Sequence, residues 1–153
     1  MFDTTHMATS DSVIEILNEP FLSINHSPSQ DLIILRWSGY ADAANYRRGL
    51  DAALEFVKEH RVKRWLADLR NMHAILSGEV KWTNEDWFPR LIAAGALRRM
   101  AIMPSSDFFN QQSVERIMNF SSGAIQFEVG YFQDEQESME WLFGHAVQNA
   151  EMV

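Results

Sequence analysis

The sequence contains no cysteine, so disulfides, iron–sulfur clusters and thiol catalysis are excluded and zinc would depend on histidine and carboxylate ligands. This composition fits a reducing compartment. No stretch approaches the roughly 18 apolar residues of a membrane span, and the first dozen residues lack the basic start and apolar run of a signal peptide. We therefore expect a cytoplasmic protein without a membrane span.

Signatures of catalysis and cofactor binding are also lacking. The seven glycines are dispersed and form neither a phosphate-binding loop nor a dinucleotide fingerprint. The five histidines show no spacing typical of a metal site, and no acidic cluster matches a calcium loop. We expect no catalytic residue, metal or cofactor, and an enzyme is the weaker hypothesis.

Positive charge is scarce, with 13 lysines and arginines against 21 acidic residues and a net charge of −8. This balance opposes binding to a phosphate backbone, so we expect no nucleic-acid partner. A local basic run, Lys58 to Arg64, is better explained as a solvated helix end.

The 153 residues fit one domain. Residues 1–12 are polar and unpatterned, and we expect a flexible N-terminus there and a single domain over 13–153.

Hydrophobic periodicity predicts the elements of this domain. Alternation over 21–26 and an apolar run over 31–37 flank a turn at 27–30, which indicates an antiparallel hairpin. Asp42 is placed to cap a helix with an apolar stripe of Tyr46, Leu50, Ala53, Leu54 and Val57. Further strands are expected at 64–69, 99–103 and 125–131, and further helices at 83–97, at 107–120 and from the Asp134 cap onward, the last with inward Met139, Leu142, Phe143 and Ala146.

This order predicts an α/β fold with a mixed five-stranded sheet. An N-terminal antiparallel hairpin is followed by helix–strand repeats whose strands run parallel through right-handed crossovers. About four helices cover the sheet.

Residues 82–91 hold two of the five tryptophans at a helix-start signal. Thr83 and Asp86 have the spacing of a capping box, and Trp82 and Trp87 that of a hydrophobic staple. A start at Asp86 is the alternative, since it would place Pro89 in the first turn at no cost. The segment is either a well-capped packing helix or a recognition surface.

In open α/β sheets, sites gather beyond the carboxyl ends of the strands. The candidate interaction surface at that edge comprises Asp68, Arg70, His73, Trp82, Glu85, Trp87 and Arg90. An ion pair between Asp68 and Arg70 is the simpler explanation of these two residues. His73 has no positioned nucleophile beside it, and a single histidine of this kind is more often a hydrogen-bonding loop residue than a catalyst.

Three segments carry a resemblance to a known family. Leu35–Asp42 (LRWSGYAD) resembles the strand–Gly–x–x–Asp entry of STAS domains, the SpoIIAA-like fold of bacterial anti-sigma factor antagonists. Leu66–Arg70 (LADLR) is similar to their next strand, and Phe132–Glu135 leading to Glu140–Leu142 is similar to their C-terminal unit. The tryptophan-rich segment looks more like that of bacterial STAS/Sec14-like proteins, to which no activity is assigned.

The resemblance implies a candidate phosphorylation switch at Ser77. In the family, a serine in an Asp-Ser-Ser-Gly turn after the third strand controls binding to a kinase-like partner. Only Ser77 and Gly78 match this turn here, because Ile75 and Leu76 stand where the family has Asp and Ser. An unmodified turn serine is the alternative.

Three functions remain in competition. The first is a non-enzymatic regulatory domain that binds a protein partner through the loop after the third strand and the following helix. The second is a small-molecule or lipid-binding domain whose apolar pocket is lined by aromatics such as Trp87, Phe88, Phe108 and Phe109. The third, more distant, is a hydrolase that uses His73 with Asp68 or Ser77. A homodimer is also open, since a sheet edge could be covered by a second copy.

Overall fold

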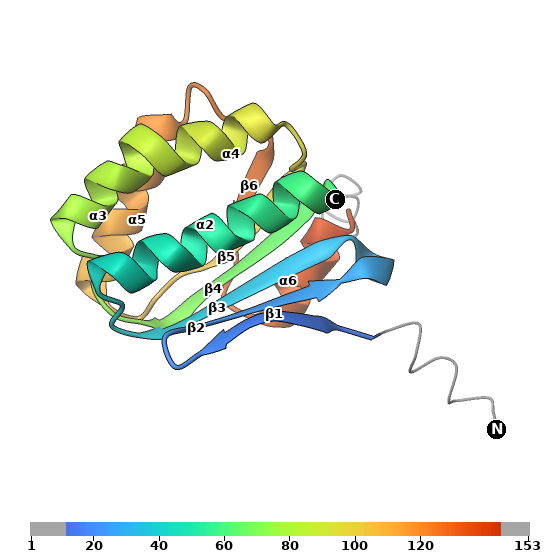
Figure 1. The fold of residues 1–153 in the computed structure, drawn as a ribbon, viewed down its shortest axis with the longest axis horizontal. Helices are drawn as coiled ribbons and strands as arrows, with labels where there is room; N and C mark the ends of the chain where they lie inside the picture. The colour runs from blue at the N-terminus through green and yellow to red at the C-terminus, as the bar shows by residue number, and fades with distance from the viewer. Residues whose placement is uncertain (1–11, 145–153) are drawn as a thin grey trace, which may run out of the picture.

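The fold is a mixed six-stranded sheet with helices on both faces, seen in a computed structural model that describes residues 12–144 (Figure 1). The spatial order of the strands follows the sequence, β1 to β6. The first three strands are antiparallel, and the remaining three run parallel to β3. The strands are β1 (Ile14–Glu19), β2 (Leu22–Ser27), β3 (Leu32–Gly39), β4 (Arg64–Met72), β5 (Arg99–Met103) and β6 (Glu128–Tyr131).

The predicted α/β class and mixed sheet are confirmed, but the count of five strands is wrong. The additional strand is β1, which lies at the edge and pairs with β2. A register shift between Glu15 and Leu17 interrupts its alternation, so no period of two marks it in the sequence. Residues 1–11 and 145–153 lie outside the described range, and with them most of the expected flexible N-terminus and Ala146 of the last apolar stripe.

Three helices begin where a capping aspartate predicts them. Asp42 accepts a hydrogen bond from the Asn45 amide at 2.9 Å at the start of α2 (Ala43–His60). Asp107 and Asp134 do the same at α5 (Phe108–Ser121) and α6 (Glu135–Leu142). These caps satisfy amides that lack a partner within the helix, which is why the boundaries are visible in the sequence.

The capping box at Thr83 is wrong, because the helix begins about two turns earlier, with Leu76 at the N-cap position. α3 (Ser77–Trp82) continues through a π-helical turn, η2 (Thr83–Trp87), into α4 (Phe88–Ala94). Pro89 lacks the amide that would bond to residue 85, and the wider turn, in which the Phe88 amide bonds to the Thr83 carbonyl, carries the helix past it.

The predicted tryptophan staple is also wrong. The ring of Trp82 packs edge-on against Tyr46, and the ring of Trp87 packs edge-on against Trp65. Within one continuous helix the two indoles are directed to different neighbours, Trp82 toward α2 and Trp87 into the core.

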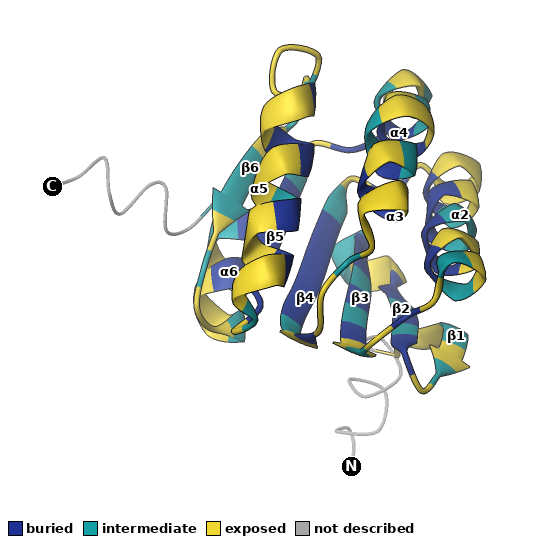
Figure 2. Cartoon of the chain, turned by 90° about the vertical axis from the view of Figure 1, so that its left-hand side faces the viewer, coloured by how far each residue is buried: buried dark blue, intermediate teal, exposed yellow. Residues whose placement is uncertain are grey.

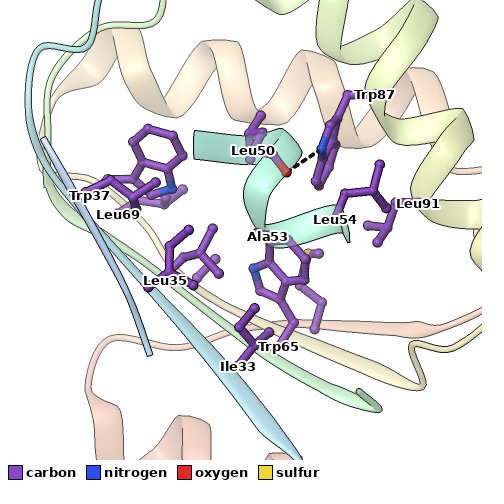
Figure 3. Packing of buried hydrophobic residues seen from close by; sticks show 14 of the residues in the cluster. Ile33, Leu35, Trp37, Leu50, Ala53, Leu54, Trp65, Leu69, Trp87 and Leu91 are labelled. Atoms are coloured by element: carbon purple, nitrogen blue, oxygen red, sulfur yellow. Dashed lines mark hydrogen bonds between the residues drawn. The ribbon is translucent and has the colours of Figure 1, made fainter. Parts of the chain in front are cut away.

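Helices α2, α3, α4 and α5 cover one face of the sheet, and α6 covers the other (Figures 1 and 2). The larger core lies under the four helices, where Trp37, Leu54 and Trp65 are buried (Figure 3). A smaller core beneath α6 contains Leu32, Leu66, Ala101, Met103 and Leu142. No helix among residues 12–144 is both long and apolar enough to cross a membrane.

Candidate functional site

The loops that follow β3, β4 and β5 meet at one end of the sheet and are hydrogen-bonded to one another. The His73 amide donates to the Gly39 carbonyl at 2.9 Å. The Ser105 hydroxyl donates to the Met72 carbonyl at 2.6 Å, and the Asn110 side-chain amide donates to the His73 carbonyl at 2.7 Å. Three segments distant in sequence therefore form one fixed platform at the carboxyl edge expected for a site.

Four large apolar side chains are exposed on this platform, and we call them the end surface: Tyr40, Leu76, Phe108 and Phe109. Phe108 and Phe109 are 61% and 68% exposed and pack edge-on, with ring centroids 5.7 Å apart. Solvent-exposed aromatics on a rigid support are typical of a binding surface.

Sequence reasoning placed the two phenylalanines in a pocket and did not single out Tyr40. The position of the two phenylalanines around the helix could have shown that they are exposed. Both phenylalanines directly follow the Asp107 cap, and neither falls on the inward face formed by Asn110, Ser113, Ile117, Met118 and Ser121.

An open groove of about 660 Å³ adjoins the end surface. It is polar, and Arg70 and His73, two residues of the predicted surface, belong to its walls. The other walls are Ser38, Gly39, Asn71, Met72, Ser106 and Asp107.

Asp68 is the buried centre of an ion-pair network on the α6 face of the sheet. Its carboxylate receives Arg36 at 3.0 Å and Arg70 at 2.9 Å, and Arg36 also reaches Glu135 on α6 at 2.9 Å. Burial opposes the charged carboxylate, but the hydrogen bonds from Arg70 and Arg36 outweigh it and hold the pKa of Asp68 below its usual range. The pairing with arginine expected from the sequence is present, and it joins β3, β4 and α6.

The tryptophan-rich segment lies in the helical layer on the opposite face. Trp87 is only 3% exposed, and its indole N–H donates to the Leu50 carbonyl at 2.9 Å (Figure 3). It is a core residue, so its predicted place on an interaction surface is corrected. The local reason is the π-helical turn, which directs this indole inward toward α2 and β4.

Trp82 and Arg90 help to hold α2 against the continuous helix formed by α3, η2 and α4. The Trp82 ring is half-buried, with the guanidinium groups of Arg47 and Arg90 at 5.2 and 5.9 Å from its centroid. Arg90 also pairs with Asp51 on α2 at 2.8 Å. Glu85 is exposed on η2. The predicted surface is therefore divided between the two faces of the sheet.

Ser77 is exposed and is the first residue of α3. Leu76 occupies the N-cap position, where no side chain accepts a hydrogen bond. A helix N-terminus attracts anions through its free amides and dipole, so this serine stands where a phosphate would be favourably received.

The hydrolase arrangement is not assembled. His73 is exposed, and among residues 12–144 its ring forms no hydrogen bond with Asp68 or Ser77. Both oxygens of Asp68 are occupied by arginine. Within the same range, no three histidine or carboxylate side chains gather as metal ligands.

The apolar pocket expected for a lipid is not formed by the four aromatics named for it. Trp87 and Phe88 line a small void of about 90 Å³, whereas Phe108 and Phe109 are exposed outside it. Pockets for drug-sized ligands occupy roughly 300–1,000 Å³, so this void is small for such an occupant.

Comparison with protein families matched the SpoIIAA-like model over residues 32–143. Comparisons with curated proteins and with solved structures gave no match. The matched segment begins with β3 and ends after α6, and it contains the platform loops, Ser77 and the Asp68 network. Domains of this family are commonly regulatory or protein-interaction domains. The resemblance seen in the sequence is thus confirmed, and the chain belongs to the SpoIIAA-like family.

Proposed function

We propose that this protein is a non-enzymatic, cytoplasmic regulatory domain that binds a protein partner through the end surface and the groove beside it. The exposure of Phe108 and Phe109 on a hydrogen-bonded platform is the observation that carries the proposal. Large apolar side chains cost free energy in water and contribute to binding when a partner covers them.

The platform favours a protein partner because it holds its contact residues in place before binding. The hydrogen bonds among Gly39, Met72, His73, Ser105 and Asn110 fix the three loops, so little conformational entropy is lost on association. Arg70 and His73 supply polar groups at the rim of the apolar cluster, as in the usual anatomy of an interface.

Regulation is proposed at Ser77, which follows Leu76 of the end surface directly. A phosphate on Ser77 would bring roughly −1.5 to −2 charges to the edge of the contact area. It would be stabilised by the N-terminus of α3 in the free protein and would change the affinity for a partner that touches Leu76.

The test begins with native mass spectrometry of the untagged protein purified gently from its own host, which identifies a stoichiometric partner. Affinity for that partner is then measured with Phe109→Ser. Loss of one hot-spot aromatic costs about 2 kcal/mol or more, so we expect affinity to fall at least about thirtyfold.

Phe120→Ser is the matched control. Phe120 is 65% exposed on the same helix but near its other end, away from the platform. The Phe120→Ser variant should bind the partner with the affinity of the unmodified protein. Equal loss in both variants, or no loss in Phe109→Ser, would remove the end surface from the proposal.

Self-association through β1 is a proposal of its own. β1 is an edge strand, and Val13 and Ile14 beside its free edge are 54% and 51% exposed. A second copy could pair along this edge. Sedimentation velocity should then give a dimer that Ile14→Lys converts to monomer, whereas a monomer at all concentrations would exclude it.

A further inference from the structure

Another cavity lies between α5 and the β5–β6 side of the sheet, and neither Phe108 nor Phe109 belongs to its walls. Its volume is about 430 Å³, within the range of small-ligand pockets. The floor is apolar and contains Leu69, Ile102 and Val114. Because Tyr131 pairs with Ile102 in the sheet, the tyrosine lines the same side as that floor.

One acidic side chain and no basic one lines this cavity, beside the neutral hydroxyl and amide groups of Ser105, Gln111, Asn119 and Tyr131. Glu115 and Asn119 line it from α5, and Tyr131 lines it from β6, but no lysine or arginine belongs to its walls. Among residues 12–144, Glu115 forms no ion pair. The walls therefore present one negative charge that no positive side chain of the cavity compensates.

Asn110 adds an acceptor that lacks a donor. The residue is fully buried and lines the cavity, and its Nδ2 is held by the His73 carbonyl. That bond fixes the orientation of the amide and leaves the buried Oδ1 without a hydrogen-bond partner. An unsatisfied buried acceptor is costly and is relieved when a donor reaches it.

The charge of Glu115 acts on Tyr131, the other ionisable group of the cavity. Burial, and then the negative charge of Glu115, raise the pKa of the Tyr131 phenol. The tyrosine therefore stays protonated, and its hydroxyl oxygen can accept a hydrogen bond while its own proton is donated elsewhere. An anionic ligand would meet repulsion from Glu115 here, whereas a cation would be attracted.

We infer that this cavity binds a small organic ammonium ion, with the apolar part of the ligand on Leu69, Ile102 and Val114 and its charged N–H groups toward Glu115 and Asn110. The ammonium supplies the positive charge that the walls lack, and its N–H groups form charge-assisted hydrogen bonds. The site is separate from the end surface, so failure of either proposal leaves the other standing.

The experiment compares three ammonium probes, isobutylammonium, cyclohexylmethylammonium and phenethylammonium, with phenethyl alcohol and 3-phenylpropionate as neutral and anionic counterparts. Binding is followed by the amide NMR signals of Asn110, Glu115 and Tyr131. At least one ammonium probe should saturate these signals about tenfold more tightly than the alcohol, because a charge-assisted hydrogen bond is roughly twice as strong as a neutral one.

Glu115→Gln keeps the shape of the side chain and removes its charge. Glu115 is exposed on its outer side, so the variant should fold normally, and we expect it to abolish the preference for the ammonium over the alcohol. Glu59→Gln removes an exposed acid on α2, makes the net charge less negative by the same amount and should retain the preference. Absence of saturation by all three ammonium probes, equal affinity for the alcohol, or an unchanged preference in Glu115→Gln would each overturn the inference.

Discussion

The hydroxyl groups of Tyr46 and Thr83 lie 2.8 Å apart inside the helical layer, where both residues are buried. Thr83 donates its proton to the Glu79 carbonyl at 2.7 Å, so the bond between the two hydroxyls takes its proton from Tyr46. Thr83 thereby accepts from α2 while it donates within its own helix. The residue expected to cap a helix instead joins two of them.

Thr83→Val preserves the shape of the side chain and removes its hydroxyl, leaving the buried Tyr46 hydroxyl without an acceptor. We expect the free energy of unfolding in urea to fall by about 1–3 kcal/mol. Tyr46→Phe combined with Thr83→Val should lose about 1 kcal/mol less than the sum of the single variants, because the unpaired hydroxyl is then absent. Strictly additive losses would show that the two hydroxyls do not interact.

Local signals explain which helix boundaries were predictable. Asp42, Asp107 and Asp134 each accept from an amide three residues onward, and this interaction requires no distant part of the chain. Thr83 and Asp86 have the same spacing, but here the pattern occurs inside a helix. The contacts that decide its role come from Tyr46 and Glu79, and the first is set by tertiary packing.

In the candidate site, too, some residues could be placed from the sequence, whereas others depend on tertiary packing. Parallel-strand topology correctly placed Arg70, His73 and Ser77 near the carboxyl edge. Proximity in sequence wrongly added Trp87, whose exposure depends on the π-helical turn and on α2. That the loops bearing Tyr40 and Phe109 meet at one end of the sheet could not be predicted from sequence, because it depends on hydrogen bonds between loops distant in sequence.

Gly49 lies in the middle of α2, where propensity alone favours alanine by about 1 kcal/mol. A Cβ at this position would stand 2.5 Å from Cδ2 of Leu22, a fully buried side chain. Overpacking of this kind costs about 1–3 kcal/mol. After the gain in propensity is subtracted, we expect Gly49→Ala to lower the free energy of unfolding by up to about 2 kcal/mol in urea denaturation.

Gly78 provides the matched control for this substitution. It lies in the first turn of α3, and a Cβ there meets no atom within 4 Å. Gly78→Ala should be neutral or stabilise the protein by up to about 1 kcal/mol. A stabilising effect at both positions would contradict the close contact between α2 and β2.

Leu76 tests where the long helix begins. It occupies the N-cap position of α3 and supplies no side-chain acceptor, so Leu76→Asp should provide one for the amides of the first turn. We expect the free energy of unfolding to rise by about 0.5–1 kcal/mol, because the carboxylate also interacts favourably with the helix dipole. Leu76→Asn should retain most of this gain in high salt. A helix that began at Thr83 would leave both variants without a gain.

His26 makes the protein sensitive to acid. Its ring is 7% exposed, lies edge-on to Phe56 at 4.7 Å, and has a buried Nδ1 without a hydrogen-bond partner. Burial, and then the positive charge of His60, lower its pKa from 6.5, against an opposing effect of Asp31. The folded protein therefore resists protonation of this ring more strongly than the unfolded chain does.

This difference between the folded-state and unfolded-state pKa of His26 determines how the free energy of unfolding changes with pH. As the pH falls below about 6.5, the unfolded chain binds the proton first, so the contribution of His26 to stability decreases until the folded-state pKa is passed. We expect His26→Leu to flatten the fall in unfolding free energy below about pH 6.5, compared with the unmodified protein in parallel urea titrations. His60→Gln should move the His26 pKa upward in an NMR titration, since it removes the neighbouring positive charge. A His26 pKa at or above 6.5 in the unmodified protein would show that solvent or a donor reaches the ring and that it does not limit stability in acid.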